Sequence, residues 1–158
     1  MLFLLFQIGS DRYALDAARV TEILPLVFLK GIPGAPPGVA GLLNHRGSPV
    51  PVLDLHAMLL GGAAENLLGT RLALVRHTAP GGEQRLLGLI VERATEMARF
   101  EPDAFIPGGV RSDGVPYLGP VAVAPGQEGL GLIQRIEVDQ LLTPEARQAL
   151  FGEPASAS

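Results

Sequence analysis

The sequence predicts an all-β fold with a few short helices, built as two small barrels pressed against each other. Twenty Gly and fourteen Pro residues divide the 158-residue chain into short segments, many of them apolar. Four pairs of these segments flank turn sequences, which is typical of β-hairpins. The sequence shows no long alternation of helix and strand, and each half is too short to bury a large core alone.

The first predicted hairpin joins residues 2–8 to residues 13–15 through a turn that contains glycine. Asp16 then caps a single helical turn that ends at Val20, because its carboxylate can accept hydrogen bonds from free amides. Residues 27–32 follow as an extended run. These segments make up the N-terminal part of the predicted β architecture.

A proline-rich stretch at residues 33–38 predicts a rigid loop, because proline lacks a backbone donor and disfavours helix and central strand. Residues 39–44 and 50–53 flank a turn and form the second predicted hairpin. Pro49 and Pro51 alternate along its second strand, so their missing donors fall on one side. This pattern predicts an edge strand or a bulge.

Asp54 is predicted to cap a short amphipathic helix at residues 55–60. The third hairpin joins residues 70–77 to residues 85–92 through an Ala-Pro-Gly-Gly turn. Residues 94–116 are predicted to be irregular, because three prolines and two adjacent glycines interrupt them.

Residues 117–123 and 130–134 form the fourth predicted hairpin around Pro-Gly. A helix begins at Thr143-Pro144-Glu145, where a hydroxyl cap, a first-turn proline and an early acid coincide. It is predicted to end near Phe151, before a glycine that can take the left-handed conformation. Residues 153–158 are predicted to be a disordered tail.

The composition excludes several functional classes. The chain has no Cys, which rules out disulfides and thiolate chemistry and fits a reducing cytoplasm. The net charge of −4 leaves no basic footprint for nucleic acid or anionic lipid. The apolar N-terminal run stops at Gln7 and lacks a basic region, and no apolar stretch approaches the roughly 18 residues that span a bilayer. We therefore predict no direct membrane insertion.

No arrangement of residues in the sequence predicts catalysis. The histidines are three: His45, His56 and His77. Their spacing from Asp54 and from other carboxylates matches no common metal site, and Asp54 is better explained as a cap. No serine lies in the Gly-x-Ser-x-Gly elbow that presents a nucleophile, and no glycine-rich loop has the form of a phosphate-binding loop. We predict no catalytic residue, no metal site and no cofactor.

One specific pattern is the turn Asn44-His45-Arg46-Gly47 followed by Pro51-Val52-Leu53-Asp54-Leu55. It lies within three stretches that follow one another in order: residues 5–23, residues 32–55, and residues 87–92 with 117–119 and 136–142. Taken together, these stretches resemble the CheW family of chemotaxis coupling proteins. His45 departs from the pattern, because the family usually has an aliphatic residue there. Gln134-Arg135 likewise replaces an apolar–acidic pair.

The resemblance implies two intertwined five-stranded SH3-like barrels within one CheW-like domain at residues 1–152. The first lobe is expected at residues 13–69. The second is expected at residues 70–142, with the first strand, residues 2–8, added to it.

The resemblance also implies a non-catalytic cytoplasmic adaptor that couples a chemoreceptor of the methyl-accepting type to a CheA-like histidine kinase. The family's contact positions fall on Val20, Glu22 and Arg46, and we include Gly47 beside them as partner-binding. The alternative for each is structural. Glu22 and Arg46 can form an exposed ion pair worth about 0–1 kcal/mol, and Gly47 can be a backbone requirement of the turn.

Three other functions fit the sequence less well. The chain can be a detached regulatory module of a histidine kinase, although the full start and end of the motif pattern favour a stand-alone adaptor. It can be a small-ligand or metal-dependent enzyme that uses His45, His56 and Asp54. It can also be a structural protein that only self-assembles.

Overall fold

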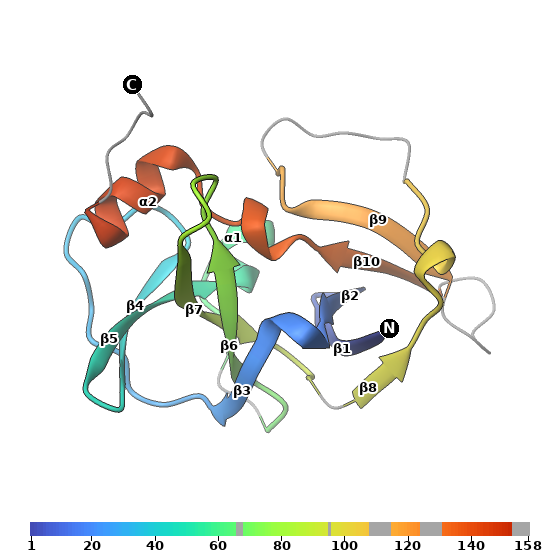
Figure 1. Ribbon diagram of the computed structural model, residues 1–158. Helices are drawn as coiled ribbons and strands as arrows, with labels where there is room; N and C mark the ends of the chain where they lie inside the picture. The colour runs from blue at the N-terminus through green and yellow to red at the C-terminus, as the bar shows by residue number, and fades with distance from the viewer. Residues whose placement is uncertain (66–67, 95, 108–114, 124–130, 153–158) are drawn as a thin grey trace.

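The computed structural model describes residues 1–65, 68–94, 96–107, 115–123 and 131–152. Its described strands form two five-stranded sheets, and short helical segments lie between some of the strands (Figure 1). This confirms the predicted all-β fold with a few short helices. None of the helices in the described ranges is long and apolar enough to cross a membrane.

The first sheet contains both the start and the end of the β structure. Its strands, in spatial order, are β8 (Glu96–Arg99), β1 (Leu2–Ile8), β2 (Asp11–Asp16), β10 (Leu132–Ile136) and β9 (Leu118–Val123). The β1–β2 hairpin confirms the first predicted hairpin, and β10 pairs in parallel with β2. The first strand therefore lies with the C-terminal strands, as expected from the resemblance.

The second sheet contains the middle of the chain. Its strands, in spatial order, are β3 (Val20–Pro25), β6 (Arg71–Thr78), β7 (Gln84–Val91), β5 (Ser48–Asp54) and β4 (Val39–His45). The second and third predicted hairpins are confirmed as β4–β5 and β6–β7. The β7 strand pairs in parallel with β5, which joins the two hairpins.

The strand pairing corrects the expected division into lobes. The expected first lobe, residues 13–69, included β2, but β2 lies in the sheet of β1 and β10. The expected second lobe, residues 70–142, included β6 and β7, but both lie with β3, β4 and β5. The physical reason is that β6 and β7 are mostly buried and that Val52–Asp54 of β5 pairs directly with β7.

The two prolines of β5 do not mark an edge strand. β5 has β4 on one side and β7 on the other, so that prediction was wrong. Pro49 and Pro51 precede Val52, the residue at which pairing with β7 begins, so the missing donors interrupt no bond of the parallel ladder. The register of this hairpin does shift, but on the partner strand, between Val39 and Gly41.

Two segments of the chain differ from the structure expected for them. The segment 94–116 contains a short strand, β8, that pairs with β1, and a 3₁₀ turn, η2 (Pro102–Ala104). The segment 27–32 makes only one isolated bridge, between Lys30 and Leu42. The turn expected at Pro125-Gly126 and the tail at 153–158 lie outside the described residues.

The helical segments begin where the capping residues predict. Asp16 accepts from the Ala18 amide at 3.0 Å and starts the 3₁₀ turn η1 (Ala17–Arg19). Asp54 starts α1 (Leu55–Leu60), and Thr143 starts α2 (Pro144–Phe151) by accepting from the Ala146 amide at 3.1 Å. α2 closes on Gly152 with φ 67°, which confirms its predicted end.

The largest buried cluster is shared by the two sheets. Phe6 and Leu15 of the first sheet belong to the same cluster as Leu87 and Leu89 of the second. The main chain also joins the sheets, because the Gln7 amide donates to the Glu92 carbonyl at 2.8 Å. Each sheet also has a smaller buried cluster of its own, so the shared cluster adds to two small cores and compensates for their size.

A polar bridge ties the connection between the sheets to the C-terminal segment. Arg19 of η1 donates to Asp139 of the 3₁₀ turn η3 (Val138–Gln140), with 3.1 Å between Nη1 and Oδ2. The same carboxylate accepts from the Thr78 amide at 2.8 Å. Burial raises the pKa of Asp139, but the hydrogen bonds from Arg19 and Thr78 outweigh it, so this pKa lies below its usual value.

Asp139→Asn should therefore reduce stability in a pH-dependent way. Because the folded pKa is depressed, the stabilisation is fully present above the unfolded pKa near 4 and is lost as pH falls through the folded value. We expect a loss of about 1 kcal/mol at pH 7, since the partly exposed pair is screened by solvent. Urea unfolding from pH 7 to pH 3 should show the two proteins converging, and a difference that stays constant with pH would contradict this account.

Candidate partner-binding surface

The Arg46-Gly47 turn joins β4 to β5 in a mirror-image conformation. His45 pairs with Ser48, so two residues make the turn, and both have positive φ, 53° at Arg46 and 87° at Gly47. The Asn44 side chain accepts from the Gly47 amide at 2.9 Å and fixes the turn from inside. The turn thus favours glycine at position 47, because its backbone there has a positive φ.

Glu22 of β3 accepts hydrogen bonds from two residues of that turn region. Its Oε2 lies 3.0 Å from His45 Nε2, and its Oε1 lies 3.4 Å from Arg46 Nη2. β3 and β4 are the two outermost strands of their sheet. The three side chains therefore span the seam where opposite edges of the sheet meet, which is how a sheet closes into a barrel.

The three side chains differ in exposure. Arg46 is 77% exposed, Glu22 33% and His45 18%. An ion pair this exposed contributes little to stability, because water screens it. The guanidinium is tethered by Glu22 at one nitrogen, and most of its surface faces solvent, where it is free to contact a partner.

Val20 differs from the other three predicted contact residues. It is only partly buried, opens β3, pairs with Val75 and packs against the core shared by the sheets. The structure brings Glu22, Arg46 and Gly47 together at one end of the sheet. It places Val20 at the start of the same strand, across a register shift from Glu22.

His45 is the member of this cluster that the sequence did not assign to the site. The sequence did contain a feature that pointed to His45, because an ionisable residue stands between Asn44 and Arg46 where the family usually has an aliphatic one. Only the fold shows its partner, since Glu22 lies 23 positions away in the chain.

Asp54, the carboxylate considered for an enzyme, is occupied by structure. Asp54 is only 5% exposed. Its carboxylate accepts hydrogen bonds from the Ala57 amide at 3.2 Å and from the Ala64 amide at 2.8 Å. It therefore caps α1, as predicted, and also holds the loop that follows.

The other two histidines lie in separate environments. His56 Nδ1 is 3.0 Å from the Gly62 carbonyl, whereas the fully buried His77 has Nδ1 3.1 Å from the Val138 carbonyl. In the ranges that the structure describes, no three His, Cys, Asp or Glu side chains gather as metal ligands would.

Comparisons with known proteins agree with this architecture. The model of the CheW-like domain family matches residues 2–146. The chain is 28% identical over 99 residues to the chemotaxis protein CheW of Helicobacter pylori. The aligned stretch covers 63% of this chain and 57% of that protein. It is 26% identical over 133 residues to the protein FrzA of Myxococcus xanthus, covering 83% and 80%.

A solved structure shows the same fold. The crystal structure of the scaffolding protein TtCheW from Thermoanaerobacter tengcongensis superposes with a TM-score of 0.72 at 23% identity, covering 87% of this chain and 84% of that one. The fold expected from the sequence, with two SH3-like barrels, is thereby confirmed. Because the family model matches nearly the whole chain, this protein belongs to the CheW-like domain family.

Proposed function

We propose that this chain is a non-catalytic cytoplasmic adaptor that couples a chemoreceptor to a CheA-like histidine kinase. The observation that carries the proposal is the exposed Arg46, held at a hairpin tip by Glu22 and by the Asn44–Gly47 bond. The names of the relatives, a chemotaxis protein and a scaffolding protein, support the same role.

The conformation of Arg46 supports a use for its side chain. A left-handed backbone costs a residue other than glycine roughly 1–2 kcal/mol, and Asn or Gly would fit the turn better. Strained residues that persist in a fold tend to lie at functional positions. A guanidinium can bind a partner carboxylate through two parallel hydrogen bonds, a geometry that suits protein recognition.

Capture from an extract of the source organism tests the proposal. The purified chain, immobilised through its C-terminus, should retain both a chemoreceptor and a histidine kinase, identified by mass spectrometry. An adaptor predicts both proteins, because its role requires two partners. Retention of neither, with the immobilised chain shown to be folded, would remove the proposed function.

A further inference from the structure

The outer strand of the second sheet, β4, has an edge that is only partly covered. Leu42 exchanges two main-chain hydrogen bonds with Lys30, of 2.8 and 2.9 Å, on the side away from β5. In an antiparallel strand every second residue directs its N–H and C=O to the same side, so Asn44 also directs its main chain away from β5. The β5 residues opposite Leu42 and Asn44 are Pro51 and Pro49, which have no N–H to offer.

The covering segment leaves this edge after the Lys30 bridge. Continuing the register, Phe28 would face Asn44, but the described residues form no pairing there. The Phe28 side chain is instead 92% exposed. Asn44 is thus an open position on a strand edge, and such a position is a template for another extended chain.

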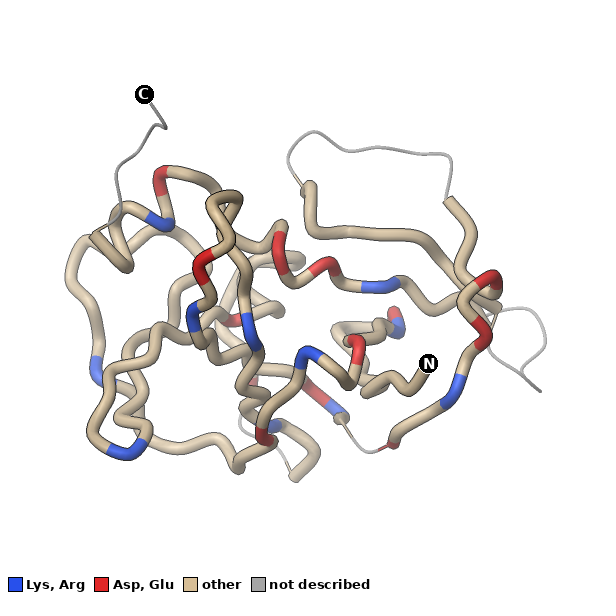
Figure 2. The backbone as a smooth tube through the Cα atoms, viewed as in Figure 1, with Lys and Arg blue, Asp and Glu red and all other residues tan. Residues whose placement is uncertain are grey.

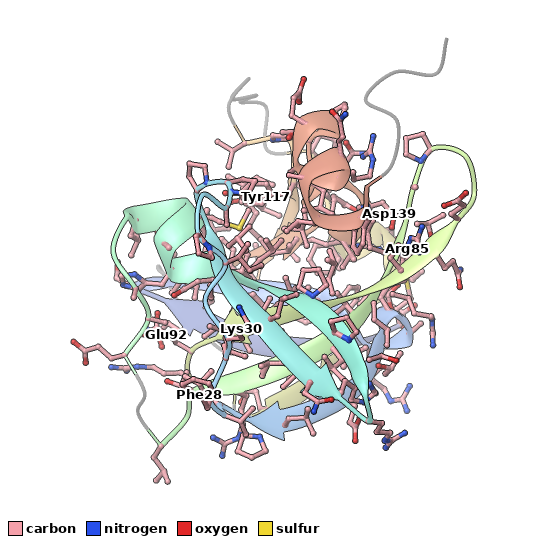
Figure 3. All side chains as sticks on the ribbon, turned by 90° about the vertical axis from the view of Figure 1, so that its left-hand side faces the viewer. Phe28, Lys30, Arg85, Glu92, Tyr117 and Asp139 are labelled. Atoms are coloured by element: carbon pink, nitrogen blue, oxygen red, sulfur yellow. The ribbon has the colours of Figure 1, made fainter. Side chains whose placement is uncertain are left out.

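A groove of about 390 Å³ lies at this open edge. Its walls combine apolar side chains with polar ends, and the lining residues are Phe28, Lys30, Leu42, Leu43, Asn44, Gly47 and Pro49. Phe28 and Lys30 lie on the connection that leads to β4 (Figure 3). The groove has room for one aliphatic side chain of a partner, with the Phe28 ring exposed beside it.

The charges around the groove are positive. Lys30 lines it, and Arg46 occupies the turn next to Gly47, so basic positions mark the connection before β4 and the β4–β5 tip (Figure 2). None of the described residues that line the groove is acidic, and Glu22, which contacts the β4–β5 turn, is already held by His45 and Arg46. An occupant with carboxylates complements this surface.

We propose that the Phe28 groove binds an extended segment of a partner protein that adds to β4 at Asn44. The segment carries one aliphatic side chain for the groove, flanked by acidic residues for Lys30 and Arg46. Main-chain hydrogen bonds to Asn44 supply affinity, and the groove and the two cations supply specificity. That the partner is a protein rests on the proposed adaptor function. Binding at the groove itself can be tested without receptor or kinase.

The probe is the capped peptide Gly-Glu-Thr-Leu-Thr-Glu-Gly, titrated into isotope-labelled protein and followed by amide NMR signals. The signals of Lys30, Asn44 and Gly47 should move together and saturate. Replacing both peptide glutamates with lysine should weaken binding at least fivefold, and replacing the leucine with serine should do the same. Equal binding of all three peptides would overturn the proposal.

Two variants connect the binding to the groove. Phe28→Ala should weaken the acidic peptide at least fivefold while the melting temperature stays within about 2 °C, because the side chain is exposed. Lys30→Glu should reverse the preference, so that the lysine peptide binds better than the glutamate one. The matched control is Leu68→Ala, which removes a side chain that is also 93% exposed and does not line the groove, and it should leave binding within twofold.

Other outcomes contradict the assignment. Peptide shifts confined to the first sheet, or a Phe28→Ala variant that binds like the wild type, would place the peptide elsewhere. Shifts of Lys30 and Asn44 on dilution of the protein alone would show that a second copy fills the groove. Failure to capture receptor and kinase while the peptide still binds would remove the adaptor function and leave the groove intact, so the two failures are distinguishable.

Discussion

Replacing Gly41 with alanine should destabilise the fold by about 2–4 kcal/mol, more than a typical surface substitution. Gly41 has φ 153°, and a Cβ there would lie 2.5 Å from the Lys30 carbonyl oxygen and 3.1 Å from Leu29 Cβ. The Lys30 oxygen is also the acceptor for the Leu42 amide, so relief of the clash breaks the bridge that holds the connection against β4. The melting temperature should fall by roughly 5–15 °C in a scanning experiment.

Gly31→Ala is the matched control for this prediction. A Cβ at Gly31 meets nothing within 4 Å, and its φ lies outside the region that disfavours side chains. Its stability should stay within about 0.5 kcal/mol of the wild type. A Gly41→Ala protein that melts within 2 °C of the wild type would show that the connection moves freely away from β4, contrary to the structure.

Removing the charge of Glu22 or Arg46 should reduce partner binding by tenfold or more and leave the fold intact. Arg46→Ala deletes a side chain that is 77% exposed, so the melting temperature should stay within a few degrees. If the guanidinium meets a partner carboxylate at a desolvated site, its loss costs about 1.5–3 kcal/mol of binding free energy, which is more than tenfold in affinity. Glu22→Ala should act in the same direction, because Glu22 holds Arg46 in place.

Arg46→Asn separates the role of the side chain from that of the turn. Asparagine accepts the left-handed conformation more readily than arginine, so this variant should be as stable as the wild type or slightly more stable. It should nevertheless bind as weakly as Arg46→Ala. Binding by isothermal calorimetry and melting must be measured on the same samples. Intact binding by the variants, or unfolding of any of them, would remove Glu22 and Arg46 from the contact surface.

Local features of the fold could be predicted because short-range chemistry determines them. Asp16, Asp54 and Thr143 each have a side-chain oxygen within reach of the free amides that follow, and each starts a helical segment. The hairpins likewise follow from turn residues that lie between apolar runs. The C-terminal helix closed on Gly152 for the same local reason.

The distribution of strands between the sheets could not be predicted from these signals. The parallel pairing of β5 with β7 joins residues that are 36 positions apart, and no residue type specifies that choice. The first lobe was expected to end at residue 69, but β5 before that point and β6 after it belong to one sheet. β8 was missed because its four residues, mostly exposed, lack the alternation that marks a half-buried strand.

The candidate site was predicted in part. The resemblance identified Glu22, Arg46 and Gly47, and the structure brings these three to one end of the second sheet. The partner of His45 depends on closure of the sheet, which brings β3 to the β4 turn and is not encoded locally. The exposure of Phe28 was also hidden, because an extended apolar run at residues 27–32 is typical of a buried strand.

A two-step capture tests the adaptor function most directly. Purified chemoreceptor signalling domain is immobilised and loaded with the chain, unbound chain is removed, and the histidine kinase is then added. The account predicts that kinase is retained only when the chain is present, and that retention falls at least tenfold with Arg46→Asn and stays within twofold with Leu68→Ala. Kinase retained equally without the chain, or a chain released from the receptor as the kinase binds it, would contradict an adaptor that contacts both at once.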